Sequence, residues 1–141
     1  MSDCLEELLN SLMTYISIAQ IEHYLLLLLI HKALRGAEVQ DQLLNILQSH
    51  LNKELTILRK IEQTKCVEGD AEKKLTEAID ALNNELNTYK DPEFISMYIN
   101  NFNNTLKTLG TNLLQHMRII NEVVEHITIR VINETQNELG S

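Results

Sequence analysis

HYLLLLLIH, residues 23–31, is the stretch of sequence that decides the fold. Its central residues, 24–30, are all apolar, and they advance by about 100° each in an α-helix, so they cover the whole circumference of that helix. A helix that is apolar on every side must be surrounded by other nonpolar groups. The stretch therefore predicts either the central helix of a bundle or a contact surface between two copies of the chain.

Size and composition indicate one helical domain spanning residues 1–141. The chain has one Pro, four Gly and no Trp, which favours helix over sheet, and no repeat or linker divides it. Its net charge of −8 comes from acidic residues spread along the chain, and its cations form no cluster, so nucleic acid is not an expected partner. Phosphate-loop, metalloprotease and hydrolase motifs are missing from the sequence, which predicts a protein that is not an enzyme.

The apolar run does not have the features of a membrane span. A span needs about 20 apolar residues, whereas residues 24–30 lie between charged side chains such as Glu22 and Lys32. The acidic N-terminus also lacks the basic start of a secretory signal. We therefore expect a cytoplasmic protein that does not bind membranes. In a reducing compartment Cys4 and Cys66, which lack metal-ligand spacing, are expected to be free thiols.

Turn and cap residues divide the chain into four expected helices. Gly36 has the place of a left-handed residue after a helix, KCVEGD (65–70) is typical of a turn, and Asp91-Pro92 is a strong helix start. The expected helices span about 4–35, 38–64, 71–89 and 92–137. The predicted fold is all-α, an antiparallel four-helix bundle of up-down-up-down topology with a long C-terminal helix.

The apolar stripe of the last helix keeps its phase across Gly110. We therefore favour one continuous helix of about 65–70 Å, with five helices as the alternative if the chain bends at Gly110. The third helix is less than half as long, so the overhang needs another cover, and a second copy of the chain is the simplest one. We expect a homo-oligomer, most simply a dimer, with these interface residues: Tyr24, Leu25, Leu28, Leu29, Leu113, Met117, Ile120 and Val124.

Two histidines lie on the apolar stripes of the first two helices. Gly36 is almost midway between His23 and His50, so an antiparallel hairpin brings both rings to nearly the same height. Glu54 follows His50 by one helical turn, on the same face. Two imidazoles and a carboxylate therefore converge, either as metal ligands or as a polar group in which Glu54 satisfies a buried histidine without any metal.

The order of these residues resembles the metal ligands of hemerythrin-like domains, also called HHE domains. The matching text is IEHYLLLL (His23), LQSHLNKEL (His50 and Glu54) and LLQHMRIINEV (His116). The resemblance implies a four-helix bundle in which these four residues ligate iron. It also implies a centre of two iron ions, bridged by carboxylates, that binds or senses dioxygen or stores iron.

The third expected helix departs from this pattern. It contains no histidine, so the family's ligands there are missing unless Glu77 or Glu85 takes their place. A straight last helix that begins at Asp91 would also place His116 far below the level of His23 and His50.

Two functional hypotheses follow from the sequence. The first is a small acidic bundle without a cofactor that acts by protein–protein interaction, as a regulatory, accessory or scaffold protein, and that self-associates. The alternative is the hemerythrin-like iron protein.

Overall fold

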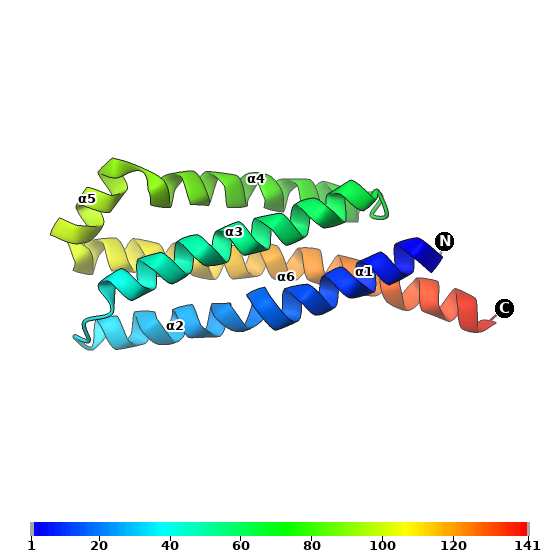
Figure 1. The fold of residues 1–141 in the computed structure, drawn as a ribbon, viewed down its shortest axis with the longest axis horizontal. Helices are drawn as coiled ribbons and strands as arrows, with labels where there is room; N and C mark the ends of the chain where they lie inside the picture. The colour runs from blue at the N-terminus through cyan, green and yellow to red at the C-terminus, as the bar shows by residue number, and fades with distance from the viewer. Residues whose placement is uncertain (1, 141) are drawn as a thin grey trace.

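The structure, a computed structural model, describes residues 2–140 and is all-helical apart from short turns (Figure 1). The helix from α1 to α2 is continuous, and it runs antiparallel to α3, which in turn runs antiparallel to α4. The predicted all-α bundle with a long C-terminal helix is confirmed. Its elements are α1 (Ser2–Thr14), the π-helix η1 (Tyr15–Gln20), α2 (Ile21–Leu34), α3 (Gln40–Thr64), α4 (Asp70–Lys90), α5 (Pro92–Asn100) and α6 (Phe102–Gly140).

The turns lie where glycine and proline predicted them. Gly36 has a φ of +91° and follows α2, where its amide donates to the Ala33 carbonyl at 3.0 Å. The turn between α3 and α4 contains Gly69, whose φ is +65°. Asp91 is the extended residue before α5, and Pro92 is the first residue of that helix.

The C-terminal region bends at Asn101, and this corrects both expectations for the last helix. It is neither continuous from residue 92 nor broken at Gly110, which lies inside α6. The short helix α5 runs across the end of the bundle (Figure 1). Tyr98 on α5 donates from its hydroxyl to the Gln40 carbonyl at 2.6 Å, and the Gln40 amide donates back to the Tyr98 carbonyl at 2.7 Å. This pair fastens the corner to the start of α3.

The asparagine-rich stretch INNFNNTLK, residues 99–107, forms this corner rather than the solvated face of a continuous helix. Asparagine competes with the helical backbone for hydrogen bonds and therefore favours helix ends. The Asn101 carbonyl accepts from both the amide and the hydroxyl of Thr105, at 3.1 and 2.8 Å. These bonds begin the new helix.

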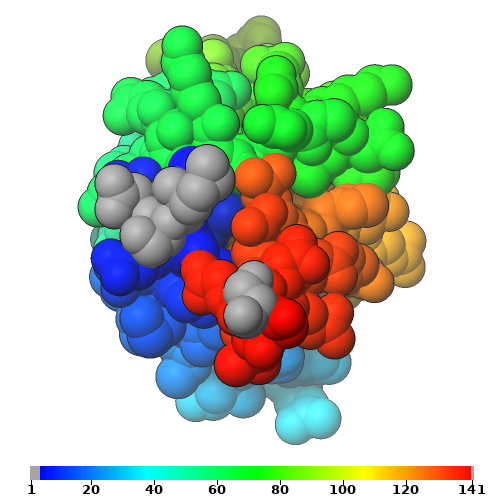
Figure 2. All heavy atoms as spheres, turned by 90° about the vertical axis from the view of Figure 1, so that its right-hand side faces the viewer, coloured from blue at the N-terminus to red at the C-terminus, as the bar shows by residue number. Residues whose placement is uncertain are grey.

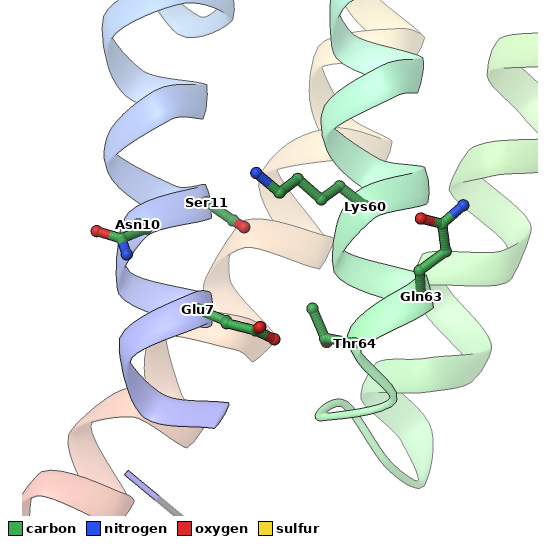
Figure 3. Close-up of a pocket in the computed structure, with 6 residues that line it drawn as sticks. All are labelled: Glu7, Asn10, Ser11, Lys60, Gln63 and Thr64. Carbon is green, nitrogen blue, oxygen red and sulfur yellow. The ribbon is translucent and has the colours of Figure 1, made fainter. Parts of the chain in front are cut away.

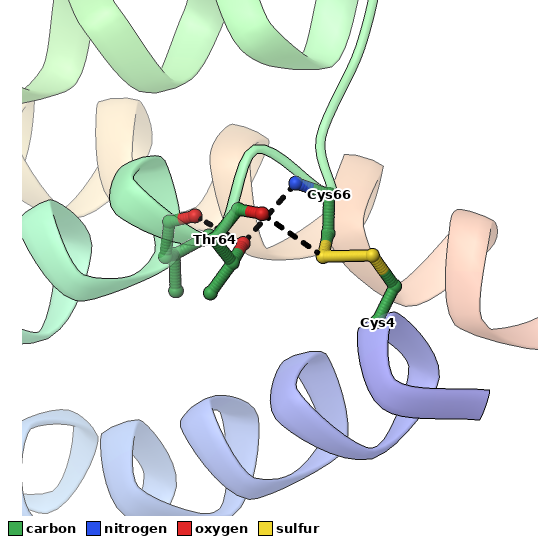
Figure 4. The surroundings of a disulfide bond; sticks show 4 residues. Cys4, Thr64 and Cys66 are labelled. Atoms are coloured by element: carbon green, nitrogen blue, oxygen red, sulfur yellow. Dashed lines mark hydrogen bonds between the residues drawn. A yellow bond between two sulfur atoms is a disulfide. The ribbon is translucent and has the colours of Figure 1, made fainter. Parts of the chain in front are cut away.

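Cys4 and Cys66 form a disulfide, so the expectation of free thiols was wrong (Figure 4). The bond joins the start of α1 to the turn after α3, with a Cα–Cα distance of 5.4 Å. The Cys66 amide also donates to the Thr64 hydroxyl at 3.2 Å. Because the two cysteines are 62 residues apart, closing this loop in the unfolded chain is worth at most about 4 kcal/mol in the loop-entropy picture.

The C-terminal half of α6 is covered by another helix of the same chain, α1, which packs against it. Figure 2 shows the N-terminal residues beside the end of α6, below the turn between α3 and α4. Val123, Ile127 and Val131 are accordingly buried. The overhang therefore gives no reason for a dimer, which corrects that step of the sequence argument.

The residues expected at an interface divide into two groups. Leu29, Leu113 and Ile120 are buried in the core of the chain itself, and Met117 and Val124 are partly buried beside them. Tyr24, Leu25 and Leu28 are exposed on the outer face of α2.

By length and composition, one helix of the described chain could span a membrane. It runs from Cys4 to Leu34, a wider window than the apolar run considered above, and 28% of its most apolar window is buried inside the bundle. Its inner face carries Tyr15, Ala19, His23 and Leu26, all packed in the core.

Replacing Gly110 with alanine should stabilise the fold by about 0.5–1 kcal/mol, since glycine is a poor residue inside a helix. A Cβ at this position would meet only Ile30 Cγ2, at the ordinary contact distance of 3.9 Å. Urea unfolding of Gly110→Ala measures the change. Gly36→Ala is the matched control and should destabilise, because the φ of Gly36 is positive. A loss of stability in Gly110→Ala would contradict the continuous α6.

Candidate metal centre

Four side chains from three helices meet inside the bundle. His23 comes from α2, His50 and Glu54 from α3, and His116 from α6, and their ligand atoms all lie within 4.8 Å of one another. The exposed fractions are 2% for His23 and His116 and 0% for His50 and Glu54. The structure thus brings together all four residues that the sequence singled out as metal ligands.

The bend at Asn101 places His116 at this level. The C-terminus of α2 and the N-termini of α3 and α6 lie at the same end of the bundle as α5. Measured from these helix ends, His23 is about 16 Å along α2, His50 about 15 Å along α3, and His116 about 21 Å along α6. A straight helix starting at residue 92 would have put His116 about 36 Å from its start. The expectation that His116 lies far below the other two histidines was therefore wrong.

Glu54 lies between the three imidazole rings. Its Oε2 atom is 3.0 Å from His23 Nε2 and 3.3 Å from His50 Nε2, and its Oε1 atom is 2.5 Å from His116 Nε2. These three nitrogens and both oxygens are buried, yet none is aligned with a partner as a hydrogen bond among the described residues. Five potential ligand atoms are therefore in close contact without the geometry of donors and acceptors.

Carboxylates hold the outer nitrogens of two of the rings. His50 Nδ1 lies 3.0 Å from Glu22 Oε1, and Lys53 Nζ lies 2.9 Å from Glu22 Oε2. On the other side, His116 Nδ1 lies 3.1 Å from Glu85 Oε2. A neutral imidazole that donates from Nδ1 to a carboxylate presents the lone pair of Nε2 inward, which is the usual arrangement around protein metal ions.

The sequence reasoning missed Glu22 and misplaced Glu85. Glu85 was considered as a replacement ligand from the third helix, but it contacts the outer nitrogen of His116. Glu77, the other candidate, is exposed on α4. Glu22 precedes His23 directly, and Lys53 follows His50 by one turn. The contacts of Glu22 with His50 and Lys53 become apparent only when α2 and α3 are packed together.

The cluster shifts the pKa values of its members in opposite directions. Burial alone would raise the pKa of Glu54, but its contacts with His116, His23 and His50 outweigh burial and hold it well below the usual range. Burial alone would lower the pKa of His116, but Glu54 and Glu85 raise it to about 9. For His23, burial wins over Glu54 and lowers the pKa. Near neutral pH the metal-free cluster thus keeps Glu54 ionised and His116 protonated.

One of the surface pockets shows that solvent reaches other parts of the bundle but not the cluster. It lies between α1 and α3, where the side chain of Lys60 reaches toward α1 and Ser11, with Glu7 and Thr64 nearby (Figure 3). Its lining contains none of the four cluster residues. The His–Glu cluster is instead closed off from solvent, so any ligand of it must be small.

Comparisons with known proteins assign no family to this chain. No protein-family model, no curated protein and no solved structure matches it. What can be said of its function therefore rests on the fold and on the geometry of the cluster.

The metal-free protein should be most stable near pH 6.5 as far as this cluster is concerned. The pKa of His116 is raised, so its contribution is complete below about 6.5 and is lost as pH rises to about 9. The pKa values of His23 and Glu54 are lowered in the folded protein, so the stability of the fold decreases as pH falls. The decrease begins at about pH 6.5 for His23 and at about pH 4.5 for Glu54.

Urea unfolding of the metal-free protein from pH 5 to pH 9.5 measures this dependence. The loss between about pH 6.5 and 9 should be at most about 3.5 kcal/mol and should be absent in His116→Gln. The same alkaline decline in the variant would show that His116 does not carry it. His126→Gln, on the same helix but outside the cluster, is the control.

Proposed function

We propose that this chain is a metal-binding helical bundle that holds one divalent transition-metal ion with His23, His50, Glu54 and His116. One observation carries the proposal: five buried ligand atoms from three helices converge on one point without being aligned as hydrogen bonds. Buried polar atoms are normally satisfied. An ion at the point of convergence would satisfy all of them at once.

The donor set supports a transition metal. Imidazole nitrogens and a carboxylate suit zinc, iron and related ions, whereas calcium and magnesium prefer oxygen alone. Outer carboxylates such as Glu22 and Glu85 are the partners that metal-bound histidines commonly have. Four protein ligands complete a tetrahedral zinc site, and they leave positions open on an ion that takes five or six ligands, such as iron.

The number of ligands supports one ion rather than two. The hemerythrin-like order of His23, His50, Glu54 and His116 favours iron among the candidate metals. A two-iron centre, however, needs further ligands, and among the described residues the helix α4 sends only Glu85 to the cluster, against the outer nitrogen of His116. We therefore propose a mononuclear site on a hemerythrin-like arrangement.

Metal content measured by plasma mass spectrometry on the purified protein, and again after anaerobic reconstitution, tests the proposal. We expect about one ion per chain. His50→Ala should abolish binding, and Glu22→Gln should weaken it about 10- to 100-fold, since it removes only the carboxylate behind His50. His31→Ala, an exposed histidine on α2, is the matched control and should bind as the wild type does.

Two results would contradict this reading. Two ions per chain would support a dinuclear hemerythrin-like centre. No binding of iron, manganese, cobalt or zinc would leave the cluster as a structural polar group. His23→Leu separates the cases further: it should abolish metal binding, but stabilise the metal-free fold or leave it unchanged, because it removes a buried polar group.

A second candidate function is self-association. It is favoured by the outer face of the first long helix, which consists of α1, η1 and α2. Several large apolar side chains are exposed there, at helical spacing that brings them to one side: Leu9, Met13, Ile16, Ile21, Tyr24, Leu25 and Leu28. Contiguous exposed apolar surface is typical of protein-interaction sites. We propose that a second copy of the chain covers this face, in a non-enzymatic regulatory or scaffold protein.

Light scattering after size-exclusion chromatography measures this association. We expect a dimer mass for the wild type and a monomer for the double variant Tyr24→Glu, Leu28→Glu, because two buried charges oppose association. Metal content should not change, since neither side chain faces the cluster. Leu114→Glu, at an exposed position of α6, is the control. A wild-type monomer at all concentrations would exclude a dimer through this face.

A further inference from the structure

Tyr15 is a buried tyrosine beside the cluster whose hydroxyl has no hydrogen-bond partner among the described residues. Its side chain is 2% exposed. The ring lies edge-on to His23, with centroids 6.4 Å apart. Burial raises the pKa of the Tyr15 hydroxyl, and the nearby Glu54 carboxylate raises it further. The polar end of Tyr15 therefore shares the interior space of the cluster.

The π-helix η1 brings this ring to the site. Tyr15 is its first residue, and His23 lies just beyond its end. In a regular α-helix residues 15 and 23 would be about 80° apart around the axis. The wider turns of η1 change this phase, so that both side chains face the core. Isolated π-helical turns of this kind are frequent at functional sites.

Packing alone does not account for a tyrosine at this position. Phenylalanine would fill the same volume without bringing a hydroxyl into the core. A buried hydroxyl without a partner is unfavourable. The neighbouring imidazoles and Glu54 are the ligand set of the proposed ion, so the hydroxyl is a donor available to whatever else binds there.

We propose that Tyr15 donates a hydrogen bond to a small exogenous ligand, an anion or diatomic molecule with an acceptor atom, that binds the ion held by His23, His50, Glu54 and His116. This inference rests on the proposed metal site and makes that site a ligand-binding centre rather than a closed structural one. The burial of all four ligands limits the partner to a few atoms. Azide is a suitable probe, because it is small, anionic and accepts hydrogen bonds.

The test compares wild type, Tyr15→Phe and Tyr24→Phe, each loaded with cobalt(II) or iron(III). Metal affinity is measured by competition with a chelator, and azide affinity by visible absorption. We expect Tyr15→Phe to bind metal within about twofold of wild type but azide about tenfold more weakly, the usual effect of losing one hydrogen bond. The exposed Tyr24 is the control, and its variant should match wild type in both measurements.

A structural role for the hydroxyl predicts different results. If the hydroxyl has no protein partner, as we propose, Tyr15→Phe should leave the metal-free protein equally stable or more stable. If the hydroxyl has a structural role, the variant should be clearly less stable, and that result would overturn the inference. Azide affinity equal to wild type would overturn it too, as would a loaded protein that does not bind azide. A tyrosinate-to-iron charge-transfer band, lost in Tyr15→Phe, would make Tyr15 a direct ligand and would also reject the proposed hydrogen bond.

Failure of the metal site itself has a separate signature. If no metal binds to the wild type, the proposed function and this inference fall together. If metal binds and only the azide results fail, the proposed function stands and the role of Tyr15 is rejected.

Discussion

The burial of Glu54 is the constraint on which the rest of the structure depends. A carboxylate with 0% exposure is costly unless opposite charge or hydrogen bonds compensate for it. Here the main compensation in the metal-free protein is the charge of the protonated His116, with His23 and His50 packed against the same carboxylate, so Glu54 is stable only when α2, α3 and α6 are docked in register. A slip of one turn in any of these helices would move an imidazole by about 5.4 Å and leave Glu54 uncompensated. The cluster therefore specifies the register of the bundle as well as forming a candidate site.

Two departures from regular helix make this register possible. The π-helix η1 keeps both Tyr15 and His23 on the inner face of the first long helix. The bend at Asn101 takes α5 across the end of the bundle, so that α6 begins at the right height for His116. Both features depart from the regular hydrogen bonding of an α-helix. Both serve to align side chains that lie at the cluster.

Much of this arrangement could be predicted from the sequence. The hairpin about Gly36 placed His23, His50 and Glu54 at one height, because helix geometry and a single turn were enough. The predicted level of His116 was wrong because the last helix was expected to run straight from Asp91, whereas the chain bends at Asn101. The Cys4–Cys66 disulfide was missed because free thiols followed from an assumed reducing compartment, not from geometry. Disulfides are typical of oxidising compartments, so this bond does not support a cytoplasmic location. The cytoplasmic location therefore stays a prediction.

The charges around the cluster give a further argument about what it holds. Glu54, Glu22 and Glu85 are carboxylates, and Lys53 pairs with Glu22, so this group carries a formal charge of about −2 when all its histidines are neutral. A divalent ion would balance that charge, whereas the metal-free protein balances only part of it by keeping a proton on His116. Ion and proton thus compete for the same nitrogen, because a histidine must be neutral to bind a metal. In a site this deeply buried, the balance of charge matters as much as the kind and number of the donor atoms, and both favour a single divalent ion.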